Sequence, residues 1–326
     1  MRCSGAVADR LRQRPLGDAV MSLILKTFIA SFTRVGWRVP TLLVTLFGLL
    51  AGCAGFDAQQ RKWIFQAATV PVSVDPSTAS EPTVADMEDV WIEHASPLSG
   101  RPIRLHALWH AHPDDDAPVL LYLHGARRDV EGSVFRIRQM SALGFSVLAV
   151  DYRGFGRSTD ELPSEATVYE DARAAWRWLG ERAAGRDRYV FGHSLGGAIA
   201  IQLASEVNDA KGLIVEGTFT SLRDVFDSMR FGWLPLGPLI TQRFDSARKI
   251  EKVQAPVLVV HGLRDTLIPP ALGRSLYERA RGPKRLVLVE GGSHYSTNAV
   301  GAAQYRHALH ELFGLGSPPE PLVSVN

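Results

Sequence analysis

Apolar and polar positions along the chain form blocks with two alternating spacings. Short continuous apolar runs, such as 119–123 and 188–191, are bounded by glycine and polar residues, which is typical of buried strands. Residues 167–179 instead place apolar side chains on one face of a helix, and Thr167 with Glu170 predicts a capping box at its start. The alternation predicts an α/β fold: a mostly parallel, twisted sheet with helices on both faces.

One domain accounts for most of the length. The runs 90–94 and 103–109 predict an antiparallel strand pair at the start of a domain that we place at 87–315. Residues 53–86 form a linker ahead of this domain, and 316–326 form a polar, proline-rich tail. We see no internal repeat and no low-complexity tract, so the chain has the length for a single core.

The most informative motif is Gly192-His-Ser-Leu-Gly196, which directly follows the apolar run 188–191 and precedes the apolar helical pattern 197–204. It matches G-x-S-x-G, in which a serine occupies a sharp turn from a strand into a helix. Such a turn needs a positive φ and leaves no room for side chains at the flanking positions, which glycine satisfies. Ser194 is therefore the candidate nucleophile.

Two further residues supply what a serine nucleophile needs. A serine hydroxyl is a poor nucleophile unless a histidine base, oriented by a buried carboxylate, activates it. Asp265 follows the predicted strand 255–260, and His294 follows the predicted strand 285–290. Because Ser194, Asp265 and His294 all fall at the carboxyl ends of predicted parallel strands, and in the order known for this kind of triad, we predict that they act together.

The oxyanion hole is predicted from backbone groups. The N–H of Leu195, the residue after the nucleophile, is one expected donor. The N–H of Ala126 is the other, because Ala126 lies just beyond the predicted strand 119–124. His124, at the buried end of that strand, is interpreted as structural.

Other groups compete for these roles. Asp151 also ends a strand but precedes Ser194, and Glu290 lies only four residues before His294, so Asp265 stays the preferred acid. His106, His110 and His112 share one face of a predicted strand and permit a metal site in principle. Their spacing matches no standard zinc pattern, and the sequence that follows is typical of a hairpin turn.

These motifs together resemble α/β-hydrolase serine hydrolases of the small-lid branch, which contains acylglycerol lipase-like and depalmitoylase-like enzymes. The resemblance runs from about 61 to 312. One departure is at Ala126-Arg127-Arg128, where many relatives carry asparagine and small residues. The matching segments are 124–126, 151–158, 192–196, 216–221, 261–265 and 292–294.

The resemblance implies a short lid over Ser194 at about 219–250 and a loop-organising role for the segment that begins at Asp151. An apolar lid predicts a hydrophobic acyl group in the substrate, although the same side chains could pack on the sheet instead. We therefore expect hydrolysis of carboxylic esters, either lipid-like esters or acyl thioesters, through an acyl-enzyme. Arg127 and Arg128 either contact an anionic head group or simply lie on the surface.

Two other functions remain open. The fold is also similar to that of small serine peptidases with an aminopeptidase-like preference, and a fold does not fix a function. A non-catalytic envelope scaffold is the alternative from a different class, but a scaffold would need none of the three predicted catalytic residues. No nucleotide, metal or organic cofactor is implied.

The N-terminal region carries a targeting signal. Lys26, Arg34 and Arg38 precede an apolar run of about a dozen residues, too short for an easy bilayer span. The run ends in Leu-Ala-Gly-Cys53, which resembles the bacterial lipobox, in which the chain is cut before a cysteine that then carries lipid. Residues 1–52 are then a lipoprotein-type signal peptide, with Met21 a possible true start. The alternatives are an uncleaved anchor or a plain signal peptide.

Composition narrows the partners. Seven of the 36 basic and two of the 34 acidic residues lie in 1–52, which leaves 29 basic and 32 acidic residues in the mature chain. No basic stripe for nucleic acid remains. Cys3 and Cys53 are the only cysteines, so no disulfide framework is expected once Cys53 is acylated. Ala54 after the cysteine resembles the choice for sorting to the outer membrane, facing the periplasm; the sequence does not fix the oligomeric state.

Overall fold

The computed structural model describes residues 55–66, 84–229, 232–234 and 237–316. The predicted signal peptide, Cys53 and the tail after 316 therefore lie outside the described residues. The chain divides into two compact units, Met1–Asp57 and Ala58–Asn326. In the described ranges, no helix combines the length and the apolar character needed to cross a membrane.

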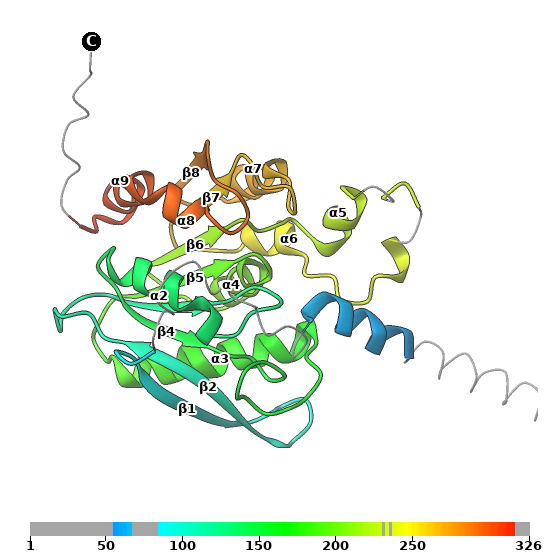
Figure 1. Ribbon diagram of the computed structural model, residues 1–326, viewed down its shortest axis with the longest axis horizontal. Helices are drawn as coiled ribbons and strands as arrows, with labels where there is room; N and C mark the ends of the chain where they lie inside the picture. Colours follow the sequence, from blue (N-terminus) through cyan, green and yellow to red (C-terminus); the bar gives the residue numbers. More distant parts are fainter. Residues whose placement is uncertain (1–54, 67–83, 230–231, 235–236, 317–326) are drawn as a thin grey trace, which may run out of the picture. The chain divides into compact units, whose positions relative to one another are not determined.

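Within the described part of the chain, eight strands form one sheet in the order β1-β2-β4-β3-β5-β6-β7-β8 (Figure 1). β2 runs antiparallel to both of its neighbours, and the six strands from β4 to β8 are parallel. The predicted antiparallel pair and the mostly parallel sheet are thus confirmed. The strands are β1 Glu88–Ala95, β2 Pro102–His110, β3 Val119–Leu123, β4 Ser146–Val150, β5 Arg188–His193, β6 Gly212–Glu216, β7 Val257–Gly262 and β8 Lys284–Val289.

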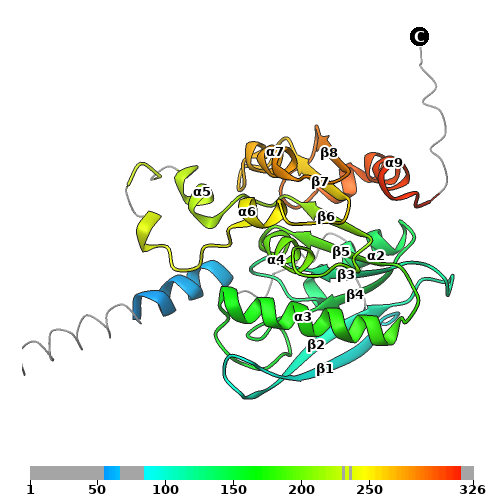
Figure 2. The same ribbon diagram turned by 180° about the vertical axis from the view of Figure 1, so that it is seen from behind.

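Helices cover both faces of this sheet, as predicted. Figure 1 is seen from the side of α2, and Figure 2 from the side of α3 and α4. From residue 84 onward, the helices in the described part of the chain are α2 Val134–Ser141, α3 Glu165–Arg182, α4 Leu195–Ala204, α5 Leu222–Asp227, α6 Ser246–Ile250, α7 Pro270–Arg279, α8 Thr297–Val300 and α9 Ala302–Phe313, with 3-10 turns at Glu131–Ser133 and Gly237–Leu239.

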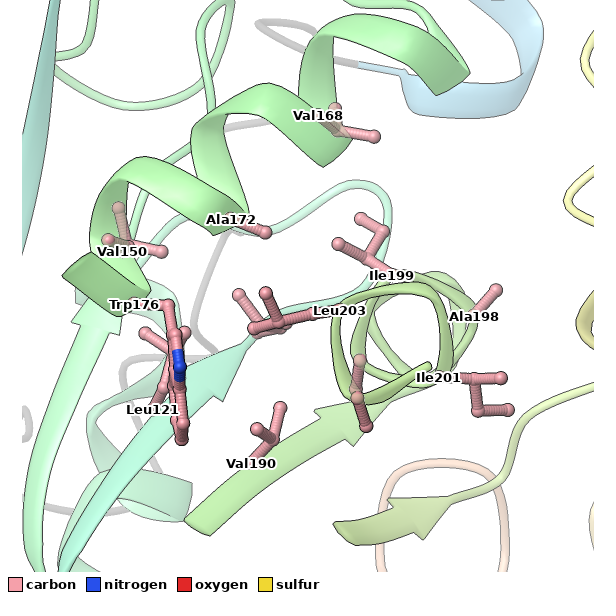
Figure 3. Packing of buried hydrophobic residues seen from close by; sticks show 14 of the residues in the cluster. Leu121, Val150, Val168, Ala172, Trp176, Val190, Ala198, Ile199, Ile201 and Leu203 are labelled. Carbon is pink, nitrogen blue, oxygen red and sulfur yellow. The ribbon is translucent and has the colours of Figure 1, made fainter. Parts of the chain in front are cut away.

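The strand pattern divides the core between the two faces. β3 is fully buried, and its side chains alternate: Leu121 belongs to the cluster with α3 and α4, whereas Tyr122 belongs to the cluster with α2 and α9. Trp176 of α3 and Leu203 of α4 pack over Leu121 on the first face (Figure 3). Continuous apolar strands are therefore required here, because both faces of the sheet are covered.

The start of α3 differs from the sequence prediction. Ser164 is the N-cap, and its hydroxyl accepts the N–H of Thr167, whose own side chain accepts the Ser164 N–H. The helix therefore begins earlier than predicted, and Thr167 is the N3 partner of the box rather than its cap. Glu170 is buried inside the helix, where it pairs with Arg153 Nη2 at 2.9 Å and accepts the Ser96 hydroxyl. The predicted capping box between Thr167 and Glu170 was wrong, because the helix is capped by Ser164 and the Glu170 carboxylate bonds to Arg153 instead.

A helix at 55–65 was not predicted, because 53–86 was interpreted as a linker. Its part in the second unit ends at Phe65, which is fully buried in the core. The Phe65 ring packs edge-on against Phe155 at 6.4 Å and Phe244 at 6.0 Å between ring centroids. The segment just ahead of the predicted domain is therefore part of its core.

The predicted lid region, 219–250, contains α5, the turn Gly237–Leu239 and α6. Its two ends are anchored, since Phe219 and Phe244 are buried. Its middle is not packed on the sheet: Met229, Trp233 and Leu239 are exposed, with 78% of Trp233 accessible. Residues 230, 231, 235 and 236 lie outside the described residues.

Candidate active site

The β5–α4 turn holds Ser194 in an uncommon backbone conformation. Its φ is 56° and its ψ −122°, a region that residues other than glycine rarely adopt. The Ser194 N–H donates to the carbonyl of Glu216 at 2.9 Å. A Cβ at Gly196 would lie 2.0 Å from the Leu123 carbonyl oxygen, and one at Gly192 would lie 2.2 Å from the Gly196 oxygen. The structure therefore has the steric features that the motif predicted.

The three predicted side chains lie within hydrogen-bonding distance of one another. His294 Nε2 is 3.0 Å from Ser194 Oγ, and His294 Nδ1 is 2.7 Å from Asp265 Oδ2. His294 and Asp265 are buried, while Ser194 is partly exposed. The geometry fits a neutral imidazole whose Nδ1–H donates to Asp265 and whose Nε2 accepts the serine hydroxyl.

Asp265 is held as a carboxylate. Burial by itself raises its pKa, but hydrogen bonds from His261, His294 and the backbone N–H of Ile268 outweigh burial and hold the pKa well below the usual range. The Ile268 N–H donates to Oδ1 at 2.8 Å, and so does the Leu267 N–H at 2.9 Å. Asp265 is therefore negatively charged throughout the neutral range and fixes the orientation of His294.

The predicted oxyanion donors flank Ser194. Leu195 is the first residue of α4, so its N–H has no acceptor within the helix. The Ala126 N–H belongs to the loop after β3, which passes so close that a Cβ at Gly125 would lie 3.0 Å from Ser194 Cβ. The next residue, Arg127, has a φ of 69°, and its N–H donates to the Phe65 carbonyl at 3.2 Å.

Three buried residues next to this site were missed by the sequence interpretation, namely His193, Arg136 and Glu216. His193 Nε2 donates to the His294 carbonyl at 2.9 Å. Arg136 of α2 donates to the Tyr295 carbonyl at 3.3 Å and to Glu216 Oε1 at 3.0 Å. The loop after β8 that carries His294 is here called the histidine loop. The carbonyls of its consecutive residues His294 and Tyr295 are thus bonded by β5 and by α2, respectively.

His193 is suited to this donor role because it stays neutral. Burial, followed by the nearby positive charge of Arg136, lowers the pKa of His193 well below its usual value. Tyr305 donates its hydroxyl to the second oxygen of Glu216, which satisfies that buried carboxylate. The only sequence signal for this cluster was that ionisable residues occur at strand ends and on an apolar helix face.

The two arginines after Ala126 have different environments. Arg128 donates to the Gly132 carbonyl at 3.0 Å, and its guanidinium lies 5.4 Å from the ring centroid of Tyr295, the neighbour of His294. Arg127 is exposed, and its side chain makes no hydrogen bond or ion pair with the residues that the structure describes. Both lie on the loop that carries the predicted second oxyanion donor.

The competing acids lie elsewhere. Asp151 accepts the Val130 N–H at 2.8 Å and lies 3.3 Å from His106 Nδ1 and 3.4 Å from His124 Nε2, so its contacts are with the loop after β3 rather than with His294. Glu290 is exposed at the end of β8. Asp151 therefore braces the loop that follows β3.

The histidines considered for a metal site have separate partners. His106 is buried between Asp89 and Asp151, and His112 Nδ1 accepts the Asp114 N–H at 3.1 Å. Among the described residues, no group of three or more histidine, cysteine or acidic side chains is arranged to hold a metal ion.

The charge on Asp265 generates a prediction on pH. Because its folded pKa is depressed, Asp265 stabilises the fold above its unfolded pKa of about 3.9, and this contribution is lost as the pH falls toward the folded pKa. Asp265→Asn should therefore lower the free energy of unfolding most at neutral pH, with the difference from wild type shrinking below about pH 4. Urea unfolding between pH 7 and 3 measures this difference in the free energy of unfolding, and Asp227→Asn, at an exposed position, is the control. A difference that stays constant with pH would contradict the depressed pKa of Asp265.

Comparison with known proteins supports a family assignment. The family described as serine aminopeptidase, S33, matches residues 115–244. An uncharacterised protein of Mycobacterium tuberculosis is 34% identical over 241 residues, covering 73% of this chain and 81% of that protein. Lysophosphatidylserine lipase ABHD12 of Danio rerio is 33% identical over 187 residues, 52% of this chain and 49% of the lipase. The chain thus spans about half the length of that lipase.

Solved structures agree on the fold. An esterase of Pyrococcus furiosus superimposes with a TM-score of 0.57 at 20% identity, covering 73% of this chain and 97% of that one. Est1E of Butyrivibrio proteoclasticus, solved with ferulic acid, gives a TM-score of 0.56 at 17% identity, covering 69% and 99%. At these identities the likeness establishes the architecture alone. Together with the family match at 115–244 and the 241-residue match to the Mycobacterium tuberculosis protein, this architecture shows that the chain belongs to the α/β-hydrolase family.

Proposed function

We propose that the chain is a serine hydrolase of carboxylic esters that works through an acyl-enzyme intermediate. The observation that carries this proposal is the continuous hydrogen-bonded line from Ser194 Oγ through His294 to Asp265, with the serine on a strained turn. Nucleophile, base and orienting acid within bonding reach of one another are the pattern that acyl transfer requires.

In the proposed first step, His294 Nε2 accepts the Ser194 proton while Oγ attacks the ester carbonyl. The backbone N–H groups of Leu195 and Ala126 stabilise the oxyanion of the tetrahedral intermediate, each lowering the barrier by about 3 kcal/mol. His294 then donates its proton to the leaving alcohol. Water, deprotonated by the same imidazole, releases the acid and restores Ser194; an acyl thioester would follow the same steps.

A lipid-like substrate is supported by exposed apolar side chains in the predicted lid region. The middle of the lid region exposes Met229, Trp233 and Leu239 instead of burying them against the sheet. Exposed apolar side chains that the core does not use are typical of a surface that receives an apolar ligand. Among the relatives, the lysophosphatidylserine lipases are named for a lipid ester with an anionic head group. We propose a single-chain lipid ester of this chemical kind as the substrate.

One observation favours an aminopeptidase instead: the matching family is described as serine aminopeptidase, S33. An aminopeptidase must hold a free, positively charged amine near the scissile bond, for which an acidic side chain is the natural partner. The first two charged residues after Ala126 are instead Arg127 and Arg128, and they disfavour a cation at that end, while Asp129 accepts the Gly132 N–H. The ester reading is therefore preferred.

We also propose that the mature chain is attached to the bacterial envelope through lipid on Cys53, on the outer membrane facing the periplasm. The support is the sequence Leu-Ala-Gly-Cys53-Ala54 behind a basic and then apolar leader. A lipid tether would hold the enzyme at a surface where lipid esters are concentrated.

Ester hydrolysis tests the main proposal. Aryl esters with acyl chains of two to sixteen carbons should be cleaved with kcat/KM rising with chain length, and Ser194→Ala should reduce kcat by a factor of about 10³ or more. Ser99→Ala, which changes an exposed serine in the turn between β1 and β2, serves as the control for folding. Cleavage of amino-acid arylamides in preference to all esters would favour the peptidase, and no serine-dependent activity on either would favour a scaffold.

The head group is tested at Arg127. Arg127→Gln should lower kcat/KM for an anionic lysophospholipid by about threefold and leave a neutral monoacylglycerol unaffected, because an exposed ion pair contributes up to about 1 kcal/mol. Arg177→Gln, an exposed arginine on α3, is the matched control. Equal effects on the two substrates would remove Arg127 from head-group recognition.

The tether is tested at Cys53. Cells that produce the wild type should incorporate labelled palmitate into the protein and retain it in the membrane fraction. Cys53→Ala should abolish labelling and release the protein from that fraction, while Cys3→Ala should change neither. Membrane retention of Cys53→Ala would instead indicate an uncleaved anchor.

A further inference from the structure

The helical residues 58–65, here called the N-terminal segment, contact three loops of the domain. The helix that contains them, drawn in blue, runs beside the stretch that follows α5 in both views (Figures 1 and 2). Its contacts run to the lid region, to the loop that ends at Pro163 and to the loop after β3. The first and the last of these belong to the proposed function, as the lid region and as the loop that carries Ala126.

The first contact is with the lid region. The side-chain amide of Gln60 is 8% exposed and bonds in both directions: Nε2 donates to the Leu239 carbonyl at 2.7 Å, and Oε1 accepts the Thr241 N–H at 3.1 Å. Both partners are backbone groups two residues apart, so one side chain fixes the path of the chain between them. Leu239 itself is among the exposed apolar residues of the lid region.

The second contact is with the loop that carries the predicted oxyanion donor. The Phe65 carbonyl accepts the N–H of Arg127 at 3.2 Å. Arg127 has a φ of 69°, a conformation that costs on the order of 1 kcal/mol for a residue with a Cβ and persists only where its surroundings hold it. The Ala126 N–H belongs to the adjoining peptide, so a bond that fixes Arg127 also limits the directions in which Ala126 can point.

Two further contacts anchor the segment itself. The ring of Phe65 lies between Phe155 and Phe244, the latter at the end of the lid region. Arg61 Nε donates to the Pro163 carbonyl at 2.8 Å, and its Nη2 donates to the Leu162 carbonyl. Through Phe155 and the loop ending at Pro163, the segment is therefore also fixed to the domain outside the two loops that it holds.

We propose that the N-terminal segment is a positioning element for catalysis, which sets the oxyanion loop through the Phe65 carbonyl and the lid region through Gln60. This inference rests on the proposed function. Oxyanion stabilisation depends on donors that are aimed before the reaction begins, so loosening Arg127 should act on the transition state. Loosening the lid region should act on the binding of long acyl chains in the ground state.

Gln66 offers a matched pair of backbone variants in the full chain. Its φ is 48°, which glycine adopts freely but proline, locked near −65°, cannot. Its N–H also donates to the Lys62 carbonyl at 3.1 Å, a bond that proline lacks. Gln66→Pro therefore turns the peptide that carries the Phe65 carbonyl, while Gln66→Gly leaves that peptide in place, and both variants lose the same side chain.

The proposal predicts a different kinetic change at each end of the segment. Gln66→Pro should lower kcat about tenfold or more with KM within about twofold, and Gln66→Gly should match the wild type. Gln60→Leu should raise KM about fivefold for long-chain esters and leave kcat for a two-carbon ester unchanged. Lys62→Ala, an exposed position on the same helix, is the control. Each variant is assayed well below its melting temperature.

Amide hydrogen exchange of the peptide covering 124–130 reports on the loop without any assay. Exchange at Arg127 should be faster in Gln66→Pro than in Gln66→Gly. Faster exchange with unchanged kcat would overturn the proposal, and so would unchanged exchange. If Gln66→Pro does not fold, an unchanged KM in Gln60→Leu would overturn it. A wild type without Ser194-dependent hydrolysis would disprove the proposed function, and the exchange comparison would still decide whether the segment holds the loop.

Discussion

The backbone of Ser194 is the constraint on which the rest of the site depends. A positive φ at a residue with a Cβ costs on the order of 1–3 kcal/mol, so the turn exists only because its surroundings enforce it. The Glu216 carbonyl holds the Ser194 N–H, and the chain packs so tightly around Gly192 and Gly196 that neither position has room for a Cβ. The strain places Oγ beside His294 and leaves the Leu195 N–H free at the start of α4.

The buried polar cluster beneath this turn extends the same constraint to the histidine loop. Glu216 holds the serine through its backbone and Arg136 through its side chain, and Arg136 in turn holds the Tyr295 carbonyl. His193, next to the nucleophile in sequence, holds the His294 carbonyl. Buried ion pairs add little net stability because desolvation offsets their attraction. Their value here is geometric, since Ser194 and the loop that carries His294 are tied to one rigid set of groups.

Sequence reasoning identified the strands more reliably than the ends of helices. A strand covered on both faces is apolar along most of its length, so β3, β5 and β7 can be recognised from their own sequence without knowledge of the neighbouring strands. The start of α3 was misjudged because Glu170 matches a capping pattern but has Arg153 as a buried partner. The helix at 55–65 was missed because its role depends on Phe155 and Phe244, which lie far along the chain.

The sequence by itself determined the α/β architecture and the positions of Ser194, Asp265 and His294 at the carboxyl ends of three of the parallel strands. Both follow from local rules, namely side-chain periodicity and the steric demands of a tight turn. Only the tertiary structure decided which groups bond to the neighbouring loops: His193 and Arg136 to the loop that carries His294, and Phe65 to the loop after β3. Those contacts join residues about 60 to 160 positions apart, and most run to backbone carbonyls, which every residue carries and which therefore leave no mark in the sequence.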